Sequence, residues 1–126
     1  MNTTATHVLL CEDDPFYSEA ISLLLSKNGY RITVVANGNE GLDLLRSEGD
    51  FGLILCGIVI PGLDGFGVLR AVKADEQLKR IPFIFLTTVS DSQSMERAQE
   101  LGADDYFIKV NAGLSHLVEL IRKHVE

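Results

Sequence analysis

Short apolar runs alternate along the chain with segments in which apolar residues recur every three or four positions. The apolar runs cover residues 7–11, 31–36, 51–56, 83–87 and 106–109. This alternation predicts βα units on a parallel sheet. The runs are apolar at every position over 8–11 and 53–56, which is typical of central strands that are covered on both faces.

A helix is predicted after the first run, and it is the best marked of five. Asp14 is suited to be its N-cap and Pro15 its first residue, while Gly29 marks its end. The apolar residues that recur in it at helical spacing are Phe16, Ala20, Leu23 and Leu24.

Four further helices follow the other runs. Asn37, with Glu40 three residues later, resembles a capping box for the second helix. Asp64 is the predicted cap of the third, and Ser90 with Gln93 opens the fourth, which Gly102 stops. Their apolar positions, together with those of a fifth helix that runs to the end of the sequence, are Leu42, Leu45, Phe66, Leu69, Val72, Met95, Ala98, Leu101, Leu114, Leu117, Val118, Ile121 and Val125.

These elements predict a doubly wound α/β fold, whose functional crevice lies beyond the carboxyl ends of the strands. The length of 126 residues fits one domain over 1–126 with its own core. Eleven basic and 18 acidic residues give a net charge of -7, so the chain has no electrostatic basis for contacting a nucleic-acid backbone or an anionic membrane directly.

The cysteines and the ends of the chain bear on its compartment. Cys11 and Cys56 each lie inside an apolar run, where a buried reduced thiol is the expected state. Residues 1–6 do not resemble a secretory signal, and the longest apolar run, 51–60, is too short to span a bilayer. We therefore expect a cytoplasmic protein.

Three carboxylates, Glu12, Asp13 and Asp14, follow the first predicted strand. Carboxylate oxygens suit Mg²⁺, and acidic side chains do not cradle a phosphate without a cation. A divalent metal site is one interpretation. The other is that Asp14 is a helix cap and its two neighbours are solvated.

Hydroxyl and ammonium groups follow two other strands. Thr87 and Thr88 end the fourth run, and Lys109 ends the fifth. Beside two carboxylates and a cation, this set suits a phosphoryl group, because metal and lysine neutralise its charge while threonine donates a hydrogen bond. Taken singly, these residues are weak signals, because a threonine at a strand end is usually a good strand former and a lone lysine there is usually solvated.

Five segments together resemble the receiver domain of two-component response regulators: VLLCEDDP, VVANGNEGLDLL, LILCGIVIPGLDGFGVLR, IPFIFLTT and ELGADDYFIK. The resemblance extends from about His7 to the end of the chain. It implies a flavodoxin-like, CheY-like fold with a five-stranded parallel sheet in the order 2-1-3-4-5 and five helices. It also implies roles for five residues, namely an Mg²⁺-binding pair (Glu12, Asp13), a switch hydroxyl (Thr87), a rotating aromatic ring (Tyr106) and a phosphate-contacting lysine (Lys109).

One position departs from the family pattern decisively. The family places a phosphoryl-accepting aspartate four residues before the proline of the Pro61–Gly65 turn, and this chain has Gly57 there. Glycine supplies neither an acyl phosphate nor a metal ligand. Val59 still offers its backbone carbonyl to a cation. Because the third carboxylate ligand is missing, Mg²⁺ binding is expected to be weak. Lys109 is left with Glu12 and Asp13 as charged partners and should pair permanently with one of them.

A second departure follows Lys109, where the family has proline and this chain has Val110. A cis peptide before valine costs about 3 kcal/mol, so a trans bond is expected there.

The resulting hypothesis is a degenerate, phosphorylation-independent receiver that docks to proteins and is not an enzyme. Its expected partners are a sensor kinase or a downstream effector. We expect these partners to contact the fourth helix, fifth strand and fifth helix, or else the apolar loop at 58–60. The chain itself is expected to be a monomer or a weak homodimer. An alternative is an ordinary phospho-accepting regulator in which Gly57 is an introduced substitution. A small Mg²⁺-dependent phosphatase is disfavoured, because haloacid-dehalogenase-type enzymes need Asp-x-Asp and Glu12 stands where the nucleophile belongs.

Overall fold

Strands and helices alternate strictly along the computed structural model, which describes residues 5–109 and 113–126. The described part contains five strands and five helices, as predicted. In chain order these are β1 (His7–Cys11), α1 (Pro15–Lys27), β2 (Arg31–Val35), α2 (Gly38–Ser47), β3 (Phe51–Cys56), α3 (Gly65–Lys73), β4 (Phe83–Thr87), α4 (Ser92–Glu100), β5 (Asp105–Ile108) and α5 (Leu114–Val125).

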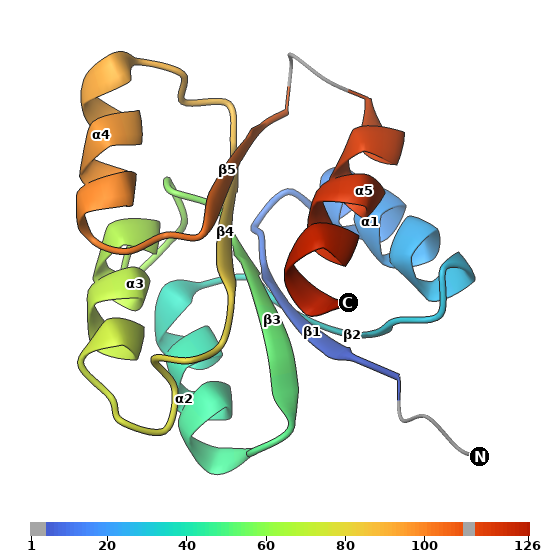
Figure 1. Cartoon of the computed structure of the whole chain (residues 1–126), viewed down its shortest axis with the longest axis horizontal. Coiled ribbons are helices and arrows are strands. Elements are labelled where there is room, and N and C mark those ends of the chain that lie inside the picture. Colours follow the sequence, from blue (N-terminus) through green and yellow to red (C-terminus); the bar gives the residue numbers. More distant parts are fainter. Residues whose placement is uncertain (1–4, 110–112) are drawn as a thin grey trace.

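The five strands form one parallel sheet in the order β2-β1-β3-β4-β5, which confirms the predicted flavodoxin-like topology. Helices α1 and α5 cover one face of the sheet and α2, α3 and α4 cover the other (Figure 1). The chain moves outward in opposite directions from β1 and β3, so the crevice of such a sheet opens at their carboxyl ends.

Two hydrophobic clusters, one on each face, hold the layers together. All residues of β1 and β4 are buried, and so are all of β3 except Gly52. Burying a leucine, isoleucine or phenylalanine contributes roughly 1.5–3 kcal/mol, so these strands supply much of the folding free energy. On the face of α2 and α3, the helices contribute Leu42, Leu45, Phe66, Val68, Leu69 and Val72; on the face of α1 and α5 they contribute Ile21, Leu25, Leu117, Val118 and Ile121.

Helix caps follow the sequence predictions in three of four cases. Asp14, Asn37 and Asp64 each accept hydrogen bonds from backbone amides in the first turn of α1, α2 and α3. The prediction of Ser90 as the cap of α4 is wrong. Asp91 holds that position because its carboxylate accepts the amide of Ser94 at 2.9 Å, and this hydrogen bond lowers the pKa of the Asp91 carboxyl.

Helix α1 exists as predicted but presents a different face to the sheet. Its buried residues are Ser18, Ile21 and Leu25, whereas Phe16 is 86% exposed and Leu23 is 58% exposed. The apolar spacing that marks this helix in the sequence therefore lies mainly on its outward side. No helix in the described ranges is long and apolar enough to cross a bilayer.

Candidate functional site

A cavity of about 210 Å³ opens where the carboxyl ends of β1, β3, β4 and β5 meet. It collects every predicted site residue except Tyr106. Its lining consists of Glu12, Asp13, Asp14, Gly57, Ile58, Val59, Ile60, Leu86, Thr87, Thr88 and Lys109.

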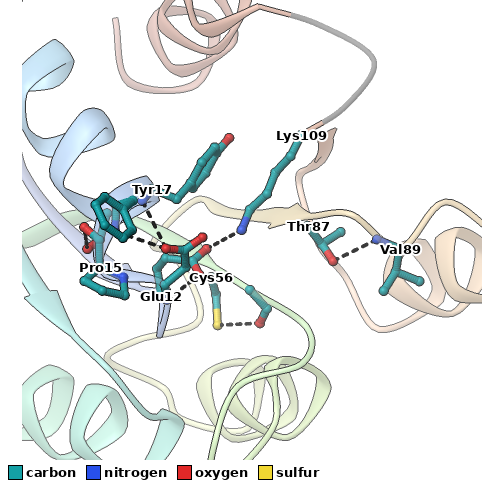
Figure 2. A network of polar contacts seen from close by, with 11 residues as sticks. Glu12, Pro15, Tyr17, Cys56, Thr87, Val89 and Lys109 are labelled. Atoms are coloured by element: carbon teal, nitrogen blue, oxygen red, sulfur yellow. Dashed lines mark hydrogen bonds and ion pairs between the residues drawn. The ribbon is translucent and has the colours of Figure 1, made fainter.

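An ion pair between Glu12 and Lys109 crosses this cavity, as Figure 2 shows. The Nζ atom of Lys109 lies 2.6 Å from Oε1 of Glu12, and the glutamate is buried. The other carboxylate oxygen of Glu12 accepts the backbone amide of Asp14 at 3.0 Å. The expectation that Lys109 pairs with one of the two acidic residues is confirmed, and the partner is Glu12.

Tyr17 is a site residue that the sequence analysis missed. Lys109 Nζ lies 4.1 Å from the centroid of its ring, within range of a cation–π interaction. Burial, together with the nearby charge of Glu12, raises the pKa of Tyr17 to about 12. Its hydroxyl is buried without a hydrogen-bond partner among the described residues. The tyrosine therefore holds the lysine through its ring and not through its hydroxyl.

Asp13 and Asp14 are exposed beside this buried pair. The Oδ1 atom of Asp14 caps α1 by accepting the amides of Phe16 and Tyr17 at 3.0 and 3.4 Å. Among the described residues, no group of three or more histidine, cysteine, aspartate or glutamate side chains is placed to hold a metal ion. The donors that fit Mg²⁺ are thus the free carboxylate of Asp13, the already paired carboxylate of Glu12 and the carbonyl of Val59, a sparse set for this ion.

Gly57 follows β3 directly and contributes only backbone to the cavity. Its amide donates to the carbonyl of Cys11 at 2.9 Å. A β-carbon built at Gly57 would lie 3.0 Å from Cγ2 of Ile60, with all other contacts at 3.6 Å or more. A side chain is therefore accommodated at this position if Ile60 moves by a few tenths of an ångström.

The loop after Gly57 exposes one of its three adjacent apolar side chains. Ile58 and Ile60 fold inward and are buried, whereas Val59 is 77% exposed. Of the two contact surfaces considered for partners, the loop at 58–60 therefore offers only the side chain of Val59 to solvent. Gly65 keeps the loop in place: its amide donates to the carbonyl of Ile58 at 2.9 Å, and a β-carbon there would collide with the carbonyl of Gly57.

Thr87, which lines the cavity, and Tyr106, which does not, both bind the loop after β4. The Oγ1 atom of Thr87 accepts the amide of Val89 at 3.1 Å (Figure 2), and the hydroxyl of Tyr106 donates to the carbonyl of Val89 at 2.7 Å. Burial raises the pKa of Tyr106, and the charge of Asp91 adds to this. Thr88 is exposed at the cavity rim.

The two cysteines lie beneath the cavity as free, buried thiols, as predicted. Cys11 and Cys56 are register partners on β1 and β3. A hydrogen bond with Cys11, together with complete burial, raises the pKa of Cys56 well above its usual value. Both residues therefore belong to the core as buried, free cysteines. Val110, whose peptide bond was expected to be trans, lies outside the described residues.

Comparison with known proteins places this chain beside one family. Residues 8–122 match the response regulator receiver domain. The chain is 39% identical over 102 residues to the transcriptional regulatory protein AfsQ1 of Streptomyces coelicolor, covering 81% of this chain but 44% of AfsQ1. It therefore spans less than half the length of that relative.

Two solved structures are similar over almost their whole length. The signal receiver domain of a signal transduction histidine kinase from Syntrophus aciditrophicus has a TM-score of 0.87 and 31% identity, covering 96% of this chain and 90% of that one. The receiver domain of the sensor histidine kinase PA1611 from Pseudomonas aeruginosa has a TM-score of 0.83 and 29% identity, covering 96% and 98%. That structure has a magnesium ion coordinated in its active site cleft.

Proposed function

The chain belongs to the response regulator receiver domain family of two-component signalling, and from this premise we propose that it is a degenerate receiver that signals without accepting a phosphoryl group. The observation that carries the proposal is Gly57. Acyl phosphate formation needs a carboxylate at the end of β3, and none of residues 57–60 carries one. We further propose that residues 1–126 form a single receiver domain with no enzymatic activity of its own.

The remaining carboxylates do not replace the missing nucleophile. Glu12 is buried, and its two oxygens are engaged by Lys109 and by the amide of Asp14. Asp13 and Asp14 are exposed at the mouth of the cavity, and Asp14 caps α1. A phosphodonor entering the cavity would therefore meet backbone at Gly57 and a lysine that is already neutralised.

Mg²⁺ is the cofactor that this family implies, and we propose that it binds weakly here. Asp13, Glu12 and the carbonyl of Val59 would hold it, and the ion would supply positive charge at the cavity mouth. Three site charges, those of Glu12, Asp13 and Lys109, sum to -1. A receiver with one more carboxylate would offer -2 and a further ligand, so the attraction here is smaller.

Protein partners are proposed to contact the surface of α4, β5 and α5. A second cavity, of about 420 Å³, lies between α4 and β5 and is lined by Met95, Glu96, Gln99, Asp104, Tyr106 and their neighbours. Its wall includes Tyr106, whose hydroxyl binds the loop after β4. A sensor kinase or a downstream effector bound there would contact the ring of Tyr106, and Tyr106 binds the same residue, Val89, as Thr87 of the candidate site. Direct binding to nucleic acid is not part of the proposal, because the net charge of -7 opposes it.

An ordinary phospho-accepting receiver in which Gly57 is an introduced substitution remains the second candidate. It is favoured by the convergence of Glu12, Asp13, Thr87 and Lys109 on one cavity, and by the space for a β-carbon at position 57. Both candidates predict the same behaviour for this chain and differ in what restoring the carboxylate achieves.

Incubation with acetyl phosphate and Mg²⁺, followed by intact-protein mass spectrometry, tests the proposal. The chain should keep its mass, whereas a stoichiometric, hydroxylamine-sensitive gain of one phosphoryl group would refute it. Gly57→Asp is the matched control. Its phosphorylation would show that the rest of the site is competent and favour the introduced substitution, whereas an inert Gly57→Asp protein would indicate a site that has lost phosphotransfer altogether.

A further inference from the structure

The outward side of α1 carries an apolar stripe that the fold leaves uncovered. Phe16 is 86% exposed and Leu23 is 58% exposed, and Ala20 between them is also exposed. At about 100° per residue, Phe16, Ala20, Leu23 and Lys27 fall within an arc of about 60°. The buried residues of α1 lie on the opposite side of the helix. Among residues 5–109 and 113–126 nothing covers this stripe. Two large apolar side chains exposed on one helix face suit a contact surface.

Charges at the two ends of this stripe have opposite sign. Exposed Asp13 and Asp14 precede its first apolar residue, and exposed Lys27 follows its last. Asp13 stands three residues before Phe16, and Lys27 stands four residues after Leu23. The stripe is thus nearly symmetric about its midpoint, with acid at one end and base at the other. Such a pattern is complementary to itself when a second copy is turned end for end.

We propose that this face of α1 binds the same face of a second copy of the chain, with the two helices antiparallel. Phe16 of each copy then lies against Leu23 of the other, and the small side chains of Ala20 near the two-fold axis let the helices approach to the usual 8–10 Å. Lys27 of each copy reaches the level of Asp13 on the other. Antiparallel helix dipoles favour the same arrangement.

This contact links the stripe to the candidate site, because Asp13 lines the mouth of the 210 Å³ cavity. The second copy thereby contributes an ammonium group to a carboxylate that has no ion-pair partner among the described residues of its own chain. The proposal concerns association alone and stands whether or not Gly57 prevents phosphorylation. A mass-spectrometric phosphorylation result and an oligomeric state are separate readouts.

Sedimentation velocity between about 20 μM and about 2 mM tests the proposal. One helix pair buries less than a standard interface of roughly 1,600 Å², so we expect a weak dimer with a dissociation constant on the order of 0.1–1 mM. Leu23→Lys should weaken it at least about 10-fold, because it places a charge in the apolar contact. Lys27→Glu should weaken it several-fold by facing acid with acid.

Arg80→Glu is the matched control for Lys27→Glu. It makes the same charge change at an exposed position before β4, remote in sequence from α1, and should leave the dimer unaltered. Circular dichroism checks that each variant is folded. A chain that stays monomeric to about 2 mM, or a dimer indifferent to Leu23→Lys, would overturn the proposal. So would an equal loss with Arg80→Glu, since that outcome reflects net charge alone.

The register is tested by cross-linking. Ala20→Cys places a thiol beside the two-fold axis, so two copies should form an intermolecular disulfide in the presence of oxidised glutathione. Ser26→Cys, on the same helix but away from the stripe, should cross-link at least several-fold more slowly. Equal rates for the two variants would contradict the antiparallel arrangement.

Discussion

Thr87 and Tyr106 hold the same residue, Val89, by its two backbone groups. The threonine oxygen accepts the amide of Val89 at 3.1 Å, and the tyrosine hydroxyl donates to its carbonyl at 2.7 Å. Thr87 ends β4 and Tyr106 lies in β5, so adjacent strands fix the start of the β4–α4 loop together. Any movement of Thr87 toward the cavity must therefore either break its bond to the amide of Val89 or move Val89, whose carbonyl Tyr106 also binds.

The first prediction is that this arrangement does not respond to a phosphoryl mimic. A ligand shifts a two-state equilibrium only through its different affinities for the two states, and without a carboxylate at Gly57 there is no group for beryllofluoride to bind. Amide NMR spectra with and without beryllofluoride and Mg²⁺ should superimpose around Thr87 and Tyr106. Large shifts there would show that the pocket switches without its aspartate, and Gly57→Asp is the positive control.

The second prediction concerns Mg²⁺. Titration calorimetry should find a dissociation constant in the millimolar range, because both a ligand and a unit of attracting charge are missing. Gly57→Asp should bind about 10-fold more tightly or better. The matching loss of affinity is expected for Asp13→Asn, which removes the exposed carboxylate without touching the buried pair. Binding of the unaltered chain below the high-micromolar range would contradict this.

The third prediction concerns the ion pair in the cavity. Lys109→Ala should destabilise the fold by about 3 kcal/mol, because it leaves Glu12 buried with one oxygen unpaired. The double variant with Glu12→Gln should recover part of this loss, since a neutral amide tolerates burial better than a lone carboxylate. Urea unfolding of the two single variants and the double variant measures the coupling. Additive effects would mean that the pair contributes nothing beyond its separate members.

The three central strands could be predicted to the residue because they are buried on both faces. In an uninterrupted apolar run there is no alternation of apolar and polar positions that could be assigned to the wrong face. The observed bounds of β1, β3 and β4 equal the predicted ones. Strands β2 and β5 carry more polar residues at the sheet edges. Strand β2 ends one residue before its predicted end, and β5 begins and ends one residue earlier than predicted. The convergence of Glu12, Thr87 and Lys109 followed from the rule that parallel strands end at one edge.

Helix orientation and single contacts were harder to predict. Helix α1 is apolar on both sides, so Phe16 with Leu23 and Ile21 with Leu25 each fit a helical spacing. Only packing against the sheet decides which set is buried. Ser90 and Asp91 are adjacent capping residues, and the backbone selects between them. Tyr17 belongs to no motif, and its contact with Lys109 joins residues 92 positions apart in the chain.

The last prediction uses the pKa of Tyr17. The folded chain holds this phenol at about 12 against 10.0 for an unperturbed tyrosine, mainly because its hydroxyl is buried and also because Glu12 is near. Between pH 10 and 12 the unfolded chain therefore releases this proton before the folded chain does, so the stabilising contribution is complete below pH 10 and is lost as pH rises through 12.

Tyr17→Phe keeps the ring beside Lys109 and removes the titrating group. Its unfolding free energy should fall less steeply over this interval than that of the unaltered chain, while at pH 7 the two should agree within about 1 kcal/mol, since the lost hydroxyl has no hydrogen-bond partner among the described residues. Urea unfolding at half-unit steps of pH measures both slopes. Parallel slopes would mean that Tyr17 ionises as easily in the folded chain as in the unfolded one. In that case, absorbance titration of the folded proteins at 295 nm would show no difference near pH 12 between the unaltered chain and Tyr17→Phe.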